Sequence, residues 1–160
     1  MTDLDLCYLP ATDAIKQFKA KTLSPVELLD ALIRRAEEVE PVINAFTYRH
    51  FDEAMDKAKK AEAKYASGGR TRALEGLPIG IKDESFIKGK PTSSGSLIMK
   101  DFVADRTSVG NERIMRAGGI VHARTATPEF SAAFCTQSRL WGATRNPWNP
   151  EFTPGRVSAS

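Results

Sequence analysis

The chain has 160 residues, of which 41% are hydrophobic and 27% are charged, a balance typical of a soluble globular protein. That length is enough for one domain with a hydrophobic core, so we expect a single domain over residues 1–160, mainly helical in 1–70 and built of strands and helices in 71–160. The net charge of +3, from 23 basic and 20 acidic residues, is too small to indicate binding to nucleic acid.

The sequence also argues against membrane and metal-dependent classes. No hydrophobic run approaches the length of a membrane span, and the acidic start Met1–Asp5 does not resemble a secretory signal. Cys7 and Cys135 lie outside metal or redox spacings, as expected for reduced cysteines of a cytoplasmic protein. The only two histidines, His50 and His122, are not near a Ser/Asp constellation, which counts against a Ser-His-Asp hydrolase or a histidine zinc site.

Two helices are predicted near the N-terminus. Residues from about Thr12 to Lys21 carry apolar residues at helical spacing, with Thr12 as the N-cap. Ser24-Pro25-Val26-Glu27 is a strong helix start, because a serine cap, a proline at the first helical position and a glutamate three residues after the cap occur together. Apolar residues recur every three or four positions from there, and Pro41 is expected to end this helix.

A third helix is predicted from about Phe51 to Ala66, after a short extended or connecting segment at Ile43–Tyr48. Its apolar face is narrow and rich in alanine. Its lysines are interleaved with acidic residues, which is typical of a solvated surface helix and not of a nucleic-acid patch. Ser67–Arg70 is then expected to form a flexible turn.

The stretch Leu77–Lys82 alternates apolar and small residues and predicts a short, mostly buried strand. Lys82 stands at its carboxyl end, where ligands tend to bind in α/β sheets. Because burial disfavours the charged ammonium, a partly desolvated lysine at that place can act as a general base. The alternative is a surface lysine that caps the strand and pairs with Asp83 or a neighbouring acid.

A strand–helix–strand unit is predicted around Lys82. The segment Val109–Ala117 has the pattern of a helix, with Val109 on its buried side, and Gly118-Gly119 is expected to terminate it. Ile120–Ala123 then predicts a buried strand. This order indicates two parallel strands joined by a crossover helix.

The last third of the chain predicts a short helix and a long loop. Thr127-Pro128-Glu129 has the cap-and-proline pattern of a helix start, with Phe130 and Phe134 expected to be buried. Residues 139–154 are expected to form a loop anchored by its two tryptophans.

Four segments then follow one another in a recognisable order: Gly76–Asp83 (GLPIGIKD), Thr92–Ser96 (TSSGS), Arg124–Phe130 (RTATPEF) and Gly142–Trp148 (GATRNPW). Together with Ile43–Phe46 (INAF), they resemble the motifs of the amidase signature family. The resemblance implies an α/β fold in which a mixed β-sheet is covered by helices. This chain would be the N-terminal part of that fold, with the sheet incomplete.

The resemblance also implies a chemistry. Family members hydrolyse a carboxamide to an acid and ammonia or an amine through an acyl-serine intermediate, using a Ser-Ser-Lys arrangement without a metal or organic cofactor. Lys82 would be the general base, acting through a bridging serine held by a cis peptide bond. The loop Thr92–Ser96 would lie beside Lys82, and Glu129 with Phe130 would support the wall of the site.

The end of the chain departs from the family pattern P-G-G-S-S-G-G-S. Pro154–Ser160 reads PGRVSAS, so Val157 occupies the aligned position of the bridging serine and Ser158 the position after it. The nucleophile belongs to a later motif that this chain does not contain. Ala126 also replaces the usual asparagine after K-T. The candidate catalytic residues are therefore Lys82 and Ser158, and the chain carries the base without the nucleophile.

Two alternatives to an amide hydrolase stay open. One is a catalytically inactive remnant of an amidase, and the other is the ammonia-supplying subunit of a tRNA-dependent amidotransferase. The expected partner is a small-molecule amide, with no nucleic acid and no membrane. Because an incomplete sheet leaves an open edge, we also expect a homo-oligomer or association through that edge.

Overall fold

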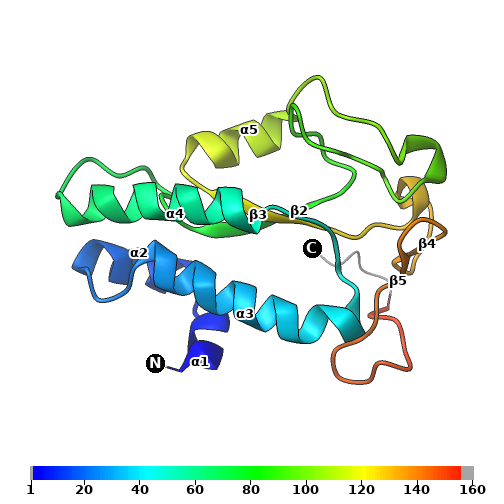
Figure 1. Ribbon diagram of the computed structural model, residues 1–160, viewed down its shortest axis with the longest axis horizontal. Coiled ribbons are helices and arrows are strands. Elements are labelled where there is room, and N and C mark those ends of the chain that lie inside the picture. The colour runs from blue at the N-terminus through cyan, green and yellow to red at the C-terminus, as the bar shows by residue number, and fades with distance from the viewer. Residues whose placement is uncertain (1, 156–160) are drawn as a thin grey trace. The chain divides into compact units, whose positions relative to one another are not determined.

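The structure is a computed structural model that describes residues 2–155 (Figure 1). It is a mixed α/β structure whose residues group into two compact units, each made of three chain segments. Unit 1 comprises residues up to Glu38, His50–Ile79 and Arg113–His122, and unit 2 comprises Val39–Arg49, Gly80–Glu112 and the residues from Ala123. The elements are α1 Asp3–Cys7, α2 Ala11–Ala20, α3 Pro25–Ile43, β1 Phe46–Arg49, α4 Phe51–Ala66, β2 Pro78–Lys82, η1 Leu97–Met99, α5 Val109–Arg116, β3 Ile120–Thr125, η2 Glu129–Ser131, β4 Gln137–Ser138 and β5 Gly142–Ala143.

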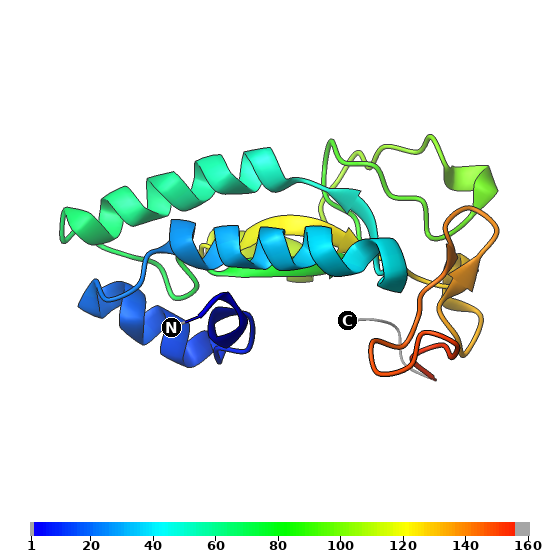
Figure 2. The ribbon, with the colours of Figure 1, turned by 60° about the horizontal axis from the view of Figure 1, so that its bottom comes forward.

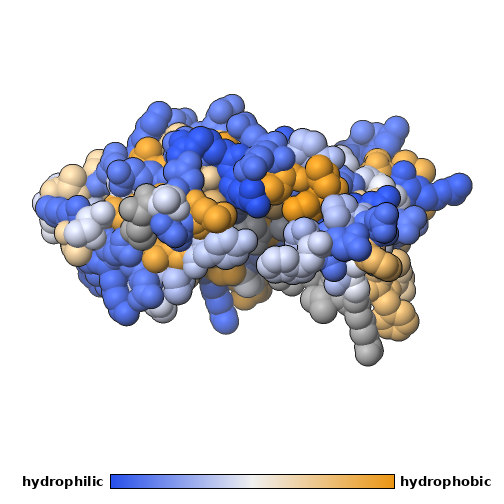
Figure 3. Space-filling model, turned by 90° about the horizontal axis from the view of Figure 1, so that it is seen from below, coloured by the Kyte–Doolittle hydropathy of each residue, from blue (hydrophilic) through white to orange (hydrophobic). Residues whose placement is uncertain are grey.

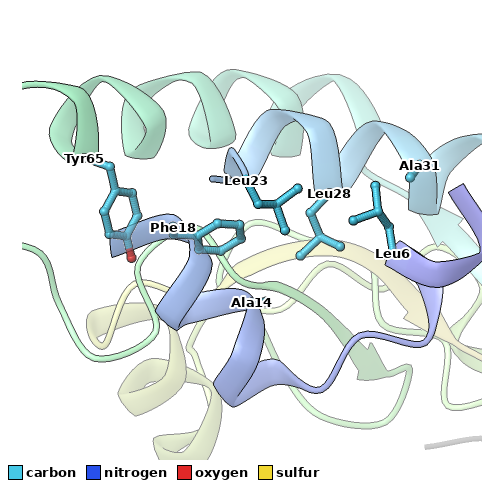
Figure 4. Packing of buried hydrophobic residues seen from close by; sticks show 7 residues of the cluster. All are labelled: Leu6, Ala14, Phe18, Leu23, Leu28, Ala31 and Tyr65. Atoms are coloured by element: carbon cyan, nitrogen blue, oxygen red, sulfur yellow. The ribbon is translucent and has the colours of Figure 1, made fainter. Parts of the chain in front are cut away.

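The main core of unit 1 joins its helices. Phe18 of α2 and Tyr65 of α4 are both buried, with ring centroids 5.7 Å apart. Figure 4 shows them together with the other buried side chains of this cluster, which come from α1, α2, α3 and the turn before α3. These are Leu6, Ala14, Leu23, Leu28 and Ala31. Burying apolar area at about 25 cal/mol per Å² is the main driving force for this packing.

A second cluster packs α3 against α4, which lie side by side in Figures 1 and 2. Leu29 of α3 is fully buried against Ala54 and Ala58 of α4, and Ile120, at the start of β3, completes the cluster. The alanines place no bulk on their face, so the two helices approach closely. The prediction of a helix over Phe51–Ala66 with an alanine-rich buried face is confirmed.

The predicted start of α3 is also confirmed. The Ser24 hydroxyl accepts hydrogen bonds from the backbone N–H groups of Val26 and Glu27, at 3.0 and 3.1 Å. In return, the Glu27 carboxylate accepts one from the Ser24 N–H at 2.8 Å. This reciprocal pair satisfies donors that have no partner inside the first helical turn.

Replacing Ser24 with alanine is expected to lower the free energy of unfolding by about 1 kcal/mol, because the cap acceptor is lost. Urea unfolding followed by circular dichroism measures the effect. Ser24→Asp is the matched control, since aspartate is an equally good cap, and it should stay close to the parent. Equal losses in the two variants would contradict the capping role.

The expectation that Pro41 ends this helix is wrong, because α3 continues to Ile43 with Pro41 inside its last turn. The backbone N–H of Asn44 still donates to the Glu40 carbonyl at 2.9 Å, so the turn closes although proline contributes no donor. The buried Glu40 carboxylate then accepts hydrogen bonds from the N–H groups of Ala45 and Phe46, at 3.1 and 2.8 Å. Glu40 thereby fixes the exit from the helix into β1.

The sheet has the strand order β1-β3-β2 and is mixed, as predicted. β1 pairs with β3 in the antiparallel sense, with Phe46 opposite Thr125 and Arg49 opposite Ala123. Beside β3, the N–H of Ile120 donates to the Leu77 carbonyl, and the N–H of Asp83 donates to the Thr125 carbonyl. The residue numbers increase in the same direction along both strands from the first bond to the second. β2 and β3 are therefore parallel, and α5 lies between them in the chain.

Glu75 lies buried in the turn that leads to β2. Its carboxylate accepts hydrogen bonds from the Arg72 guanidinium at 2.6 and 2.8 Å and from the Lys64 amine at 3.0 Å. The Arg72 hydrogen bonds outweigh the effect of burial and lower the pKa of Glu75 to about 2. Gly118 packs so closely on this turn that a Cβ there would meet the Glu75 backbone at 2.7 Å, and its φ of +104° also favours glycine.

Three burial predictions are wrong. Val109, at the first position of α5, is 65% exposed, and Asn111 is the buried residue of that helix. Asn111 is held there because its amide donates to the Ser85 hydroxyl and the Phe86 carbonyl. Phe130 and Phe134, expected in a buried helix, are 53% and 74% exposed.

The reason for the exposed phenylalanines is local backbone geometry. Only the single turn η2 forms after Pro128, and Phe130 and Ser131 have φ of +49° and +55°. Residues in the left-handed conformation cannot continue a right-handed helix.

Downstream, the expected loop contains the small hairpin β4–β5. Trp141 packs edge-on against Tyr48 at 5.1 Å, whereas Trp148 is 89% exposed, so only one tryptophan anchors it.

The surface combines hydrophilic side chains with scattered hydrophobic ones, as Figure 3 shows for one face. Within residues 2–155, no helix has the length and hydropathy that a membrane crossing requires. Cys7 and Cys135 are both free thiols.

Candidate active site

The predicted base, Lys82, is the last residue of β2 and lies in unit 2. Its side chain is only 19% exposed. The amine donates a hydrogen bond to the Ser131 hydroxyl at 3.0 Å and forms an ion pair with the Glu84 carboxylate at 3.0 Å. A strand end therefore presents a largely desolvated amine to one hydroxyl and one acid.

The Ser131 hydroxyl is the centre of this cluster. It donates a short hydrogen bond to Glu84 and lies 2.9 Å from the hydroxyl of the buried Thr127. Burial tends to raise the pKa of Glu84, but the hydrogen bonds from Ser131 and Lys82 outweigh it, and the pKa is lowered. Glu84 is thus a carboxylate at neutral pH, and the cluster Lys82–Ser131–Glu84–Thr127 contains an amine, two hydroxyls and a carboxylate.

Arg124 supports the backbone beneath Lys82. Its side chain is fully buried, and its Nη2 donates to the carbonyls of Lys82 at 3.1 Å and Ser85 at 2.7 Å. The same nitrogen lies 3.8 Å from the carboxylate of Asp83, which is also fully buried. One guanidinium therefore fixes the path of the chain through Lys82, Asp83 and Ser85.

Asp83 connects this strand end to the loop Thr92–Ser96. Its carboxylate accepts a hydrogen bond from the Ser93 N–H at 3.1 Å and a short one from the Ser93 hydroxyl. Burial raises the pKa of Asp83, although the Ser93 hydrogen bonds and Arg124 act in the opposite direction. The Trp141 indole N–H also donates to the Ser93 hydroxyl at 2.8 Å. The resemblance placed this loop beside Lys82, and these hydrogen bonds attach it to the next residue, Asp83.

The same loop holds the segment that carries Ser131. The Ser96 hydroxyl donates to the Glu129 carboxylate at 2.6 Å, and the Phe130 N–H donates to the Ser94 carbonyl at 2.8 Å. Gly95 makes the approach possible, because a Cβ at this position would lie 2.6 Å from the Thr127 carbonyl oxygen. Glu129 and Phe130 are thus hydrogen-bonded to the loop Thr92–Ser96, which is itself attached to Asp83.

A cavity of about 640 Å³ opens next to this segment. That size is within the range of small-molecule sites. Its lining combines apolar and polar side chains: Glu129, Phe130, Ala132, Ala133, Gln137, Ser138 and Arg139. Two of the lining residues, Phe130 and Ala132, flank Ser131 in the sequence.

Of the two candidate catalytic residues predicted from the sequence, Lys82 and Ser158, only Lys82 lies among the described residues. Lys82 lies at the carboxyl end of β2 as expected, and the alternative expectation that it pairs with a neighbouring acid is met by Glu84 and not by Asp83. Ser158 and Val157 lie outside the described residues. Sequence reasoning missed Ser131 and Glu84. The only signal for Ser131 was its place directly after the Glu129-Phe130 motif, 49 residues from Lys82.

Over residues 2–155, the structure has no group of three or more His, Cys, Asp or Glu side chains placed to hold a metal ion. Burial lowers the pKa of His122 to about 4, so this histidine is neutral at pH 7. It stacks on Phe51, with the two ring centroids 6.5 Å apart.

Comparison with known proteins identifies the family. The family model described as Amidase matches residues 27–159, which is most of the chain. The chain therefore belongs to the amidase family, and its α/β fold is that of amidase signature enzymes.

The similar curated proteins include a component of the glutamyl-tRNA(Gln) amidotransferase of Gloeothece citriformis (strain PCC 7424), 34% identical over 89% of this chain and 30% of that protein. The corresponding amidotransferase component of Agathobacter rectalis is 33% identical over 97% of this chain and 31% of that protein. The chain thus spans about three tenths of the length of these relatives.

Solved structures agree with this fold. A bacterial aryl acylamidase belonging to the amidase signature enzymes has a TM-score of 0.87 at 28% identity, over 95% of this chain and 32% of that chain. A fatty acid amide hydrolase superposes on 100% of this chain with 28% of its own length and a TM-score of 0.91, and at 24% identity this likeness shows the fold alone.

Proposed function

We propose that this chain provides Lys82 as the general base of a site that hydrolyses the C–N bond of a carboxamide, giving an acid and ammonia or an amine through an acyl-serine intermediate. The observation that carries the proposal is the contact of 3.0 Å between the Lys82 amine and a serine hydroxyl. A hydroxyl is a poor nucleophile until a base within hydrogen-bond reach removes its proton.

Three features of the site support this role. The lysine is largely shielded from water, and its amine lies within hydrogen-bond distance of a hydroxyl, the geometry that proton transfer requires. Arg124 and Asp83 hold the strand end rigid, which maintains the geometry of the amine. The cavity beside η2 provides room for a small amide. Ser158, the residue after the aligned position of the bridging serine, stays a proposed catalytic residue.

A second candidate function is that of the amide-cleaving component of an amidotransferase. The similar curated proteins of the glutamyl-tRNA(Gln) amidotransferase favour it, with 34% identity over 89% of this chain for the one from Gloeothece citriformis. In that case the ammonia would pass to a charged tRNA, and the chain would act together with other subunits. An inactive remnant is the third candidate, supported by Val157 at the aligned position of the relay serine.

Replacing Lys82 with methionine is expected to reduce ammonia release from simple amides by about 100-fold to 10,000-fold, the usual contribution of a positioned base. Methionine retains the length and packing of the lysine stem. The measurement is a coupled ammonia assay on the purified protein, alone and with the proteins that copurify with it.

Lys88→Met is the matched control, since Lys88 is exposed and lies outside the cluster, and it should leave the rate unchanged. Release that requires copurified subunits and charged tRNA would favour the amidotransferase. Equal rates for the parent and Lys82→Met would exclude the role of Lys82, and an inactive remnant would release no ammonia with or without partners.

A further inference from the structure

We propose that unit 1 carries a binding site for a small organic polyphosphate, of the class of the nucleoside diphosphates. The site is a basic cavity of about 410 Å³ that is lined by α4, by the turn before β2 and by the end of α5 with the start of β3. All of its lining residues belong to unit 1. None of them belongs to the Lys82 cluster, so the inference does not depend on the proposed role of Lys82.

The first argument is the charge of the cavity wall. Lys57, Lys60 and Lys64 of α4 all line the cavity. They are three and four residues apart in a helix, a spacing that brings side chains to one helix face. Arg72 adds a fourth cation from the turn before β2, and among the described lining residues Glu75 is the single acid. Four cations therefore converge on one cavity from two separate parts of the chain.

A fixed ion-pair cluster forms one side of the cavity. The buried Glu75 carboxylate accepts hydrogen bonds from Arg72 at 2.6 Å and from Lys64 at 3.0 Å. Gly118 allows this packing, because a Cβ there would lie 3.2 Å from the Arg72 Nε and 2.7 Å from the Glu75 Cα. An ammonium and a guanidinium carry more N–H donors than this pairing uses. The Lys64 and Arg72 side chains are 46% and 48% exposed, so their other donors can reach a ligand.

The remaining lysines of α4 leave positive charge unbalanced. Lys57 pairs with Glu53, one helical turn before it, at 2.7 Å. Lys60 is exposed and forms no ion pair within residues 2–155. The four lining cations thus contact two carboxylates, those of Glu53 and Glu75, and two positive charges are in excess. An anion with two or more negative charges would balance them.

The other lining residues indicate the rest of the ligand. Met115, Gly119 and Ile120 give the cavity an apolar side opposite in character to the lysines. A volume of about 410 Å³ is within the range of sites for small organic molecules. Lysine ammonium groups bind phosphate as point charges, and a methionine thioether makes favourable contacts with aromatic rings. A nucleoside diphosphate combines a multiply charged phosphate chain with a flat ring, so it matches both sides of the cavity.

The test is isothermal titration calorimetry of the 160-residue chain with ADP at low ionic strength. We expect saturable binding of one ADP, weakened as the salt concentration rises because salt screens the lysine charges. Lys60→Met should weaken the binding about fivefold, and the double variant Lys57→Met/Lys60→Met about 20-fold, since partly exposed charge pairs each contribute modestly. Methionine retains the packing of the lysine stem, and circular dichroism checks that the variants keep their helix content.

Lys59→Met is the matched control, because Lys59 is an exposed lysine of the same helix that does not line the cavity, and it should bind ADP like the parent. Adenosine, which lacks the phosphates, should not bind. Absence of saturable ADP binding, or equal affinity in the parent and the double variant, would overturn the inference. So would adenosine or inorganic pyrophosphate binding as tightly as ADP, or a single-stranded RNA oligonucleotide binding where ADP does not.

Discussion

The variant Arg124→Met is expected to lose about 3–5 kcal/mol of unfolding free energy, because it leaves the buried Asp83 carboxylate without a cation. Both side chains are fully buried, so water cannot replace the guanidinium. The variant also removes the donors to the carbonyls of Lys82 and Ser85. A loss of this size is a large part of the stability of a typical domain, so much of the protein would be unfolded at 37 °C.

The measurement is guanidinium chloride unfolding of the four proteins of a double-mutant cycle: the parent, Arg124→Met, Asp83→Asn and the double variant. Asp83→Asn alone should be destabilising through its hydrogen bonds to Ser93, and combining it with Arg124→Met should recover part of the second loss, because no charge is then left unpaired. The control Arg113→Met removes a cation from the α5 helix and should cost less than about 1 kcal/mol. Strict additivity of the two single variants would contradict an interaction between Arg124 and Asp83.

Acidification is expected to destabilise the protein in two stages. His122 has a folded pKa of about 4 against an ordinary value of 6.5, because burial disfavours its charged form. The unfolded chain therefore binds the proton first, and stability falls as the pH drops from 6.5 towards 4. Glu75, with a folded pKa of about 2 against 4.5, loses its contribution as the pH falls from 4.5 towards 2. Each displacement corresponds to roughly 3 kcal/mol.

The free energy of unfolding measured from about pH 7 to about pH 2.5 tests both stages. Glu75→Gln should be less stable at neutral pH and should lose the slope below pH 4.5, whereas Glu38→Gln, an exposed acid on α3, should follow the parent curve. His122→Gln should flatten the curve between pH 6.5 and 4. A parent curve that is flat across both windows would show that neither group is linked to folding in this way.

The sequence predicted the parts of the fold that depend on local periodicity and capping. The helix at Phe51–Ala66, the cap at Ser24 and the strand ending at Lys82 all appear at the expected places. The errors arose where a tertiary contact or an unusual backbone overrides local preference. Asn111 is buried by hydrogen bonds to a distant loop, and Phe130 is turned outward by its left-handed φ.

For the site, the sequence predicted that Lys82 stands at the end of a strand, and it missed the side chains that contact the Lys82 amine. Asp83 and Glu84 both lie past the end of β2, in the turn that follows it, so the alternation of strand side chains does not tell which of them pairs with Lys82. The contact with Ser131 could not be predicted either, because it joins residues 49 positions apart through a loop fold that only tertiary structure defines.

The interleaving of the two units has a consequence for how the chain folds during synthesis. Unit 1 lacks its last segment until Arg113–His122 has left the ribosome, and unit 2 depends on residues from Ala123 onward. Neither unit can therefore be completed before the segment from Arg113 onward has been synthesised. The closing contacts are long-range in sequence, which raises the contact order and slows folding. Because the segments of the two units alternate along the chain, no single proteolytic cut separates both units intact.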